Sequence, residues 1–174
     1  MITIDYCKHF ARYNRWQNQS AYAAAGKLPD GTRKRNMGAF FKSIHGTLNH
    51  LVVGDQLWLD RFEGVPTSIT SLDQELHDDF DELTKKRELT DNRLDRLVAS
   101  LDDTRLSGTL KFRRLSGDKG ELTLPVSIVM MQLFNHQTHH RGQVTTLLMQ
   151  CGVDVGVTDM PMLPAEFASP VFGL

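Results

Sequence analysis

The sequence predicts an all-α protein: a four-helix bundle with a short β-hairpin between the third and fourth helices and a C-terminal wrapping tail. Apolar residues recur at spacings of three and four in four long segments, a pattern typical of amphipathic helices. The pattern alternates only between residues 106 and 124, as expected of a hairpin. The 174 residues match the size of one ordinary domain and contain no linker, so we expect a single domain over residues 1–174.

The first two helices are predicted at residues 5–27 and 37–62. Three consecutive alanines at positions 23–25 favour the first helix, and Pro29-Asp30-Gly31 is expected to end it. Gly64 and Pro66 are expected to end the second helix. The apolar stripe of the second helix consists of Ile44, Leu48, Leu51, Trp58 and Phe62.

The third helix is predicted at residues 71–101, with Ser71 as its N-cap and a heavily charged, solvent-exposed surface. The hairpin follows, with its turn at residues 116–120. Pro125 stands where the first residue of a helix belongs, so the fourth helix is predicted from there to Cys151, with Gly152 as its stop. Residues 153–174 are expected to form the tail, with one short helix.

Composition excludes several classes of protein. Hydrophobic residues make up 40% of the chain and charged residues 24%, which excludes wholesale disorder. The 20 basic and 21 acidic residues give a net charge of −1, too little positive charge for non-specific nucleic-acid binding. No apolar run approaches the roughly 20 residues that span a bilayer, and the N-terminus does not resemble a signal peptide. With only Cys7 and Cys151 present, we expect a cytoplasmic protein with no membrane or nucleic-acid partner.

Three of the seven histidines, His136, His139 and His140, lie within five residues of the fourth helix. At about 100° per residue, His136 and His140 are about 40° apart and about 6 Å apart along the axis. Two imidazoles at i and i+4 can bind one metal ion. His139 points about 60° to the other side of His136, so it either borders the site or replaces His140.

This face of the helix is unusually polar for a core-facing stripe. Gln132 lies one turn before His136, and Gln143 lies seven residues after it. Buried polar side chains are unfavourable unless they are paired or bind a ligand, so the stripe predicts a site inside the bundle.

A third ligand must come from another helix, and three candidates remain open. His50 is favoured because it lies in the middle of an apolar stretch, whereas His45 lies nearer the start of that helix. Asp55 would instead give a set of two histidines and one carboxylate. Three histidines would leave coordination positions open for water or an anionic substrate, which favours a catalytic role.

Neighbouring polar residues are candidates for supporting roles. Asn135 and Gln143 are expected to orient ligands or bound water, and His139 to border the site. Asp55 is expected either to pair with Arg141 or to hold a histidine. Tyr13 is a candidate general acid whose direction the sequence does not fix.

Three segments carry a family resemblance. Residues 50–62, with His50 and Asp55, and residues 135–143, with the run His139-His140-Arg141-Gly142-Gln143, resemble the DinB/YfiT family of damage-inducible, metal-dependent proteins. Residues 13–18 resemble the first-helix signature of that family.

The resemblance implies a four-helix bundle with an up-down-down-up path. It also implies that His50, His136 and His140 hold one divalent metal ion, one ligand from the second helix and two from the fourth. Many family members are similar to low-molecular-weight-thiol transferases or isomerases, and dimers are frequent. The resemblance therefore implies a small-molecule substrate, a thiol co-substrate and a homodimer.

Three kinds of function remain open. The first is a metal-dependent enzyme, either a low-molecular-weight-thiol S-transferase acting on an electrophile or a hydrolase. The second is a non-catalytic metal-binding protein of the stress response. The third is an interaction module whose histidines only fill the core. Imidazole ligands suit zinc, nickel, iron and manganese, so they do not identify the metal.

Overall fold

The computed structural model describes residues 2–115 and 120–167, which are mostly helical as predicted. These residues form α1 (Ile4–Gly26), α2 (Asp30–Lys34), α3 (Ile44–Glu63), α4 (Phe80–Ala99), α5 (Asp103–Ser107), β1 (Thr109–Arg113), β2 (Glu121–Pro125), α6 (Val126–Gln150) and the 3₁₀ helix η1 (Met160–Met162). None of the helices in these ranges is long and apolar enough to cross a membrane.

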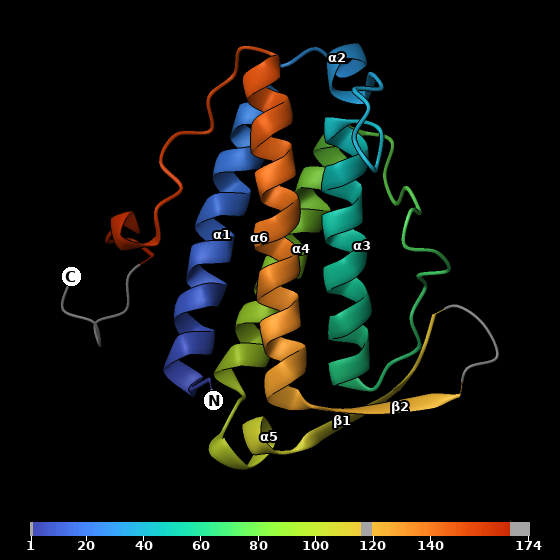
Figure 1. The fold of residues 1–174 in the computed structure, drawn as a ribbon, viewed down its shortest axis with the longest axis vertical. Helices are drawn as coiled ribbons and strands as arrows, with labels where there is room; N and C mark the ends of the chain where they lie inside the picture. The colour runs from blue at the N-terminus through green and yellow to red at the C-terminus, as the bar shows by residue number, and fades with distance from the viewer. Residues whose placement is uncertain (1, 116–119, 168–174) are drawn as a thin grey trace.

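The four long helices α1, α3, α4 and α6 stand side by side (Figure 1). Helix α1 contacts α4 and α6, and α3 contacts the same two helices. Two apolar clusters fill the space between them. The cluster toward the hairpin includes Leu59, Leu97 and Phe134, and the cluster toward α2 includes Leu48, Leu83 and Leu148.

A buried polar layer lies between the two clusters. It consists of Asn14, Asn18, Asp55, Arg87, Asp91, Gln137 and Arg141. Arg87 has an Nη1 atom 2.7 Å from Asp55 and an Nη2 atom 2.8 Å from Asp91. Because buried charges are unfavourable without partners, this layer restricts how the four helices can meet.

The second predicted helix begins seven residues later than expected. Ser43 caps α3 by accepting a hydrogen bond from the Gly46 backbone N–H at 2.9 Å. Before it, Lys42 has a φ of +67°, a left-handed conformation that cannot continue a helix. Gly64 ends α3 in the left-handed conformation, as predicted.

The third predicted helix also begins later than expected. Asp79, not Ser71, caps α4, because its side chain accepts a hydrogen bond from Glu82 N at 2.9 Å. Residues 64–79 instead run along α3, where Asn49 Oδ1 accepts hydrogen bonds from the backbone N–H groups of Leu76 and His77. Those N–H groups are therefore not available to a helix.

The remaining elements lie close to their predicted positions. Helix α1 agrees within one residue at each end, although Pro29-Asp30-Gly31 leads into the short helix α2. Pro125 precedes the first residue of α6 and is also the last residue of β2.

The hairpin and the tail lie on the outside of the bundle. Strands β1 and β2 pair antiparallel, with Phe112 opposite Leu122, across one end of the bundle (Figure 1). The predicted turn lies outside the described residues except for Gly120. The tail runs along α1, where the Tyr13 hydroxyl donates a hydrogen bond to the Thr158 carbonyl oxygen at 2.7 Å. Residues 168–174 lie outside the described part of the chain.

Candidate metal centre

Three histidines meet between α3 and α6. His50 comes from the middle of α3, and His136 and His140 stand one turn apart on α6. His50 Nε2 lies 3.0 Å from His136 Nε2 and 3.2 Å from His140 Nε2. Two nitrogens bound tetrahedrally to one zinc ion at about 2.0–2.1 Å lie about 3.3 Å apart. The spacing of the three side chains therefore fits a shared metal ion.

Hydrogen bonds on the far side of two rings determine which nitrogen faces the centre. His50 Nδ1 lies 2.7 Å from the Leu72 carbonyl oxygen, which can only accept, so Nδ1 carries the proton. His140 Nδ1 donates in the same way to Gln143 Oε1 at 2.7 Å. Each neutral ring therefore presents an unprotonated Nε2 to the centre. Two lone pairs 3.2 Å apart repel each other unless a cation lies between them, so the donor set fits a metal ion.

All three histidines are held in the neutral form that binds metal. Burial, together with the smaller effects of the neighbouring His140, His50 and His139, lowers the pKa of His136 to about 3. Burial also lowers the pKa of His50, against the effect of the hydrogen bond to Leu72. The pKa of His140 is lowered mainly by burial, although its bond to Gln143 opposes the shift. The site therefore needs no proton release from these rings before it binds a cation.

Two neighbours fix the positions of the rings. A Cβ atom at Gly54 would lie only 2.7 Å from His136 Cε1, so the absent side chain makes room for this ring. The ring of Phe41 stacks on His50 with centroids 3.7 Å apart. The helical histidine spacing did not reveal either residue, nor the carbonyl of Leu72. A glycine inside a helical pattern was a local signal for Gly54, whereas the other two lie on loops.

The other residues predicted near the site lie at different distances from it. Gln143 contacts His140, as an orienting residue should, and its Nε2 lies 3.3 Å from His139 Nε2. His139 is exposed and lines the same cavity without joining the three nitrogens. Asn135 is exposed and lines a different cavity, between α1 and α6, together with Tyr13. Gln132 is also exposed, so the polar stripe is shorter than predicted.

Asp55 lies in the buried polar layer, outside the three-histidine group. It pairs with Arg87 and accepts a hydrogen bond from Gln137 Nε2. Among the described contacts, Arg141 donates to Gln137, Asn14 and Asn18 instead.

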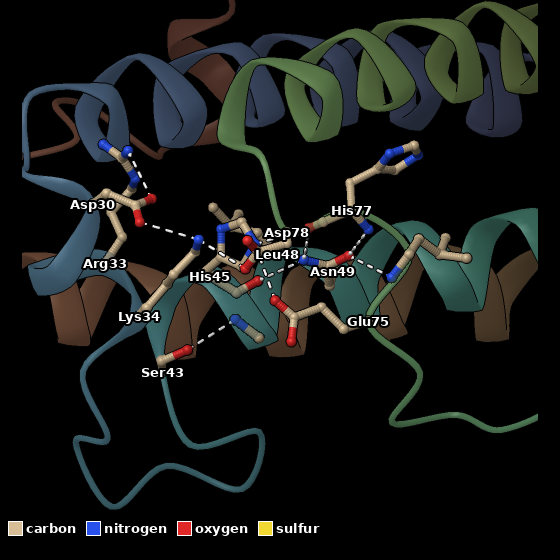
Figure 2. Close-up of polar contacts among 12 residues, drawn as sticks. Asp30, Arg33, Lys34, Ser43, His45, Leu48, Asn49, Glu75, His77 and Asp78 are labelled. Carbon is tan, nitrogen blue, oxygen red and sulfur yellow. Dashed lines mark hydrogen bonds and ion pairs between the residues drawn. The ribbon is translucent and has the colours of Figure 1, made fainter.

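His45 belongs to a second group of metal-binding side chains, with Glu75 and Asp78, whose donor atoms lie within 4.8 Å of one another (Figure 2). These donors already have partners. His45 Nε2 lies 2.9 Å from His77 O, and Asp78 pairs with Lys34 at 2.7 Å. The ammonium group of Lys34 therefore supplies the positive charge at this position.

Comparison with known proteins identifies the family of the chain. A sequence model of the DinB family matches residues 1–166. The chain belongs to the DinB family. It is similar to Protein DinB of Bacillus subtilis (strain 168), with 26% identity over 159 residues that cover 89% of this chain and 91% of that protein. The crystal structure of a DinB-like protein from Bacillus cereus ATCC 10987 matches with a TM-score of 0.63 and 22% identity, over 85% of this chain and 94% of that one.

These matches confirm the resemblance read from residues 13–18, 50–62 and 135–143. The DinB-like structure supports the helical fold alone. The three-histidine group of this DinB-family chain is compatible with binding a metal ion.

Proposed function

We propose that the protein binds one divalent metal ion through His50, His136 and His140 and uses it to transfer a low-molecular-weight thiol to an electrophile. The observation that carries the proposal is the convergence of three Nε2 atoms, two of them left unprotonated by their hydrogen bonds. Membership of the DinB family supports the same assignment.

The site can admit a small molecule. A cavity of about 600 Å³ opens onto the three histidines and is also lined by His139 and Gln143. A divalent cation held there supplies positive charge, which lowers the pKa of a thiol that reaches it. The thiol proton leaves to solvent through the mouth of the cavity, which His139 also lines. The thiolate sulfur then bonds to the electrophilic carbon as the leaving group departs with its electron pair.

The first test is the metal content of tag-free protein purified without a nickel column, beside the His50→Ala variant. We expect about one equivalent of metal in the native protein and almost none in the variant. A native protein that is empty and also refuses added zinc, nickel and iron would contradict the proposal.

A second pair of variants tests the ligand assignment on α6. His136→Ala should abolish metal binding, because only two of the three nitrogens remain. His139→Ala should retain it, since this side chain lies outside the group. Metal retained in the first variant, or lost from the second, would overturn the assignment.

Turnover separates an enzyme from a metal-binding protein without activity. The metal-loaded protein should consume a model electrophile, such as monobromobimane, faster with a low-molecular-weight thiol present than the thiol does alone. His136→Ala protein that has been treated with the metal in the same way should not. Equal rates with and without the native protein would favour a non-catalytic role in the stress response.

The path of the helices and the assembly of the chain also belong to the proposal. We propose one domain that follows an up-down-down-up path, and the contacts of α3 with α4 support it: His45 packs near Phe80, and Asp60 pairs with Arg93. The first contact joins the starts of α3 and α4, and the second joins their later parts, as in two parallel helices. The homodimer and the cytoplasmic location stay predictions, and size-exclusion chromatography with light scattering tests the first.

A further inference from the structure

The mouth of the histidine cavity carries two large apolar side chains that face solvent. Phe40 is 84% exposed and Leu72 is 51% exposed. Both line the same cavity of about 600 Å³ as the three histidines. A single exposed apolar residue is ordinary, but two that border one cavity with convergent polar groups are typical of a ligand site.

Local backbone geometry holds Phe40 and Phe41 at the cavity. They occupy the centre of a tight turn in which Lys42 N donates to Ala39 O at 2.8 Å. The turn places Lys42 at a φ of +67°, which is unfavourable for a residue with a side chain. It also brings the carbonyl oxygen of Phe41 so close to Gly46 that a Cβ atom there would overlap it. The loop is therefore held in one specific, strained arrangement.

The two phenylalanines have different surroundings. Phe41 is half-buried, stacks on His50 and presents its ring edge-on to His140 at a centroid distance of 5.5 Å. Phe40 packs on Phe41 with centroids 4.8 Å apart and leaves most of its own surface in water. Phe41 thus supports the metal ligands, whereas Phe40 has an apolar surface free for a ligand.

The part of the cavity wall that contains Leu72 is tied to α3. The backbone carbonyl of Leu72 accepts the hydrogen bond from His50, which fixes the residue beside the site. Further along the same segment, Asn49 binds the N–H groups of Leu76 and His77, and Lys34 pairs with Asp78 (Figure 2). The side chain of Leu72 is therefore exposed on a segment that is held at several points.

We infer that this cavity binds a ligand with an aromatic or similarly flat apolar group next to the atom that reaches the three histidines. Phe40 and Leu72 contact that group and determine specificity. The inference rests on the proposed metal site and adds the chemical class of its ligand. An aromatic group that covers these two side chains removes their apolar surface from water, which adds favourable free energy of binding. A small polar ligand does not cover this surface and lacks that contribution.

The test uses two hydroxamates that bind a metal ion through the same group but differ in their substituent. Cobalt-loaded protein is titrated with benzohydroxamate and with acetohydroxamate, and the cobalt absorption bands report binding of each. We expect the phenyl compound to bind about tenfold more tightly, equivalent to about 1.4 kcal/mol. In the Phe40→Ala/Leu72→Ala double variant, this preference should fall to twofold or less while cobalt still binds. The exposed side chains make both substitutions tolerable for folding.

Leu89→Ala is the matched control, because Leu89 is 61% exposed on α4 and does not line this cavity. It should keep the full preference. Equal affinities of the native protein for the two hydroxamates, no binding of either, or an unchanged preference in the double variant would overturn the inference while leaving the metal site intact. Failure of the native protein to bind cobalt would overturn the proposed function and this inference together.

Discussion

At the scale of single residues, the candidate site depends on two hydrogen-bond acceptors and one glycine. The Leu72 carbonyl and the Gln143 side-chain oxygen accept hydrogen bonds from the protonated Nδ1 atoms of His50 and His140, so Nε2 of each ring is left unprotonated. Gly54 has no side chain and leaves space for His136. None of these three residues contributes a ligand atom, yet each decides where one lies.

The role of Gly54 gives a prediction. In Gly54→Ala, the new methyl group would lie 2.7 Å from His136 Cε1, so the ring must move away from the other two histidines. We expect zinc affinity to fall about 10- to 100-fold, the range found when residues that support a metal ligand are replaced. Competition with a chromophoric chelator measures this change.

Gly142→Ala on α6 is the control, because nothing lies within 4 Å of a Cβ atom there. Alanine is a better helix former by about 1 kcal/mol, so this variant should melt higher and bind zinc as the native protein does. Equal zinc affinities for the two alanine variants would contradict the steric role of Gly54.

The sequence identified the histidine pair on α6 because that relation is local. It left His45 and His50 both open, since five residues rotate a helix by about 500° and the two rings point about 140° apart. Which of the two faces α6 depends on how the helices pack, and only the structure shows that His50 does. The supporting residues Phe41 and Leu72 belong to loops, which carry no periodic signal.

At the scale of elements, the start of α4 shows how a long-range contact decides between two local signals. Ser71 with Gln74 and Asp79 with Glu82 both match the pattern of a helix N-terminus. Asn49 decides between them, because it binds the N–H groups of Leu76 and His77 and keeps this segment out of a helix. No property of residues 71–79 alone reveals that partner.

This role of Asn49 can be tested by removing its side chain. Asn49→Ala leaves the N–H groups of Leu76 and His77 without their acceptor, so the free energy of unfolding should fall by about 2 kcal/mol. Hydrogen exchange at these two amides should become at least about tenfold faster, because local opening becomes easier.

Asn36→Ala serves as the comparison, since Asn36 makes one exposed hydrogen bond to Gly38 N. It should change the free energy of unfolding by no more than about 0.5 kcal/mol. Unchanged exchange at Leu76 in Asn49→Ala would show that other contacts hold the segment.

At the scale of the whole molecule, the polar layer joins all four long helices. Asp55 from α3, Arg87 and Asp91 from α4, Asn18 from α1 and Gln137 from α6 form one connected set. Gln137 and Arg141 each stand next to a histidine of the site in sequence. The layer therefore fixes the depth at which α6 lies against α3, and with it the meeting of the histidines.

Arg87 is the centre of this layer, so its removal should affect the whole fold. Arg87→Met leaves the buried carboxylates of Asp55 and Asp91 without their cation and should reduce the free energy of unfolding by about 3–5 kcal/mol at pH 8.

Burial raises the pKa of Asp55 to about 6 even though Arg87 opposes the shift, and without Arg87 this pKa should rise further. The folded variant then binds a proton more readily than the unfolded chain, so its deficit relative to the native protein should shrink as the pH falls from 8 to 5. Urea unfolding at both pH values measures this, beside Arg15→Met, whose partly exposed pair with Asp95 should contribute about 1 kcal/mol or less. A deficit that stays constant or grows toward pH 5 would mean that Asp55 remains ionised without Arg87 and that another group balances its charge.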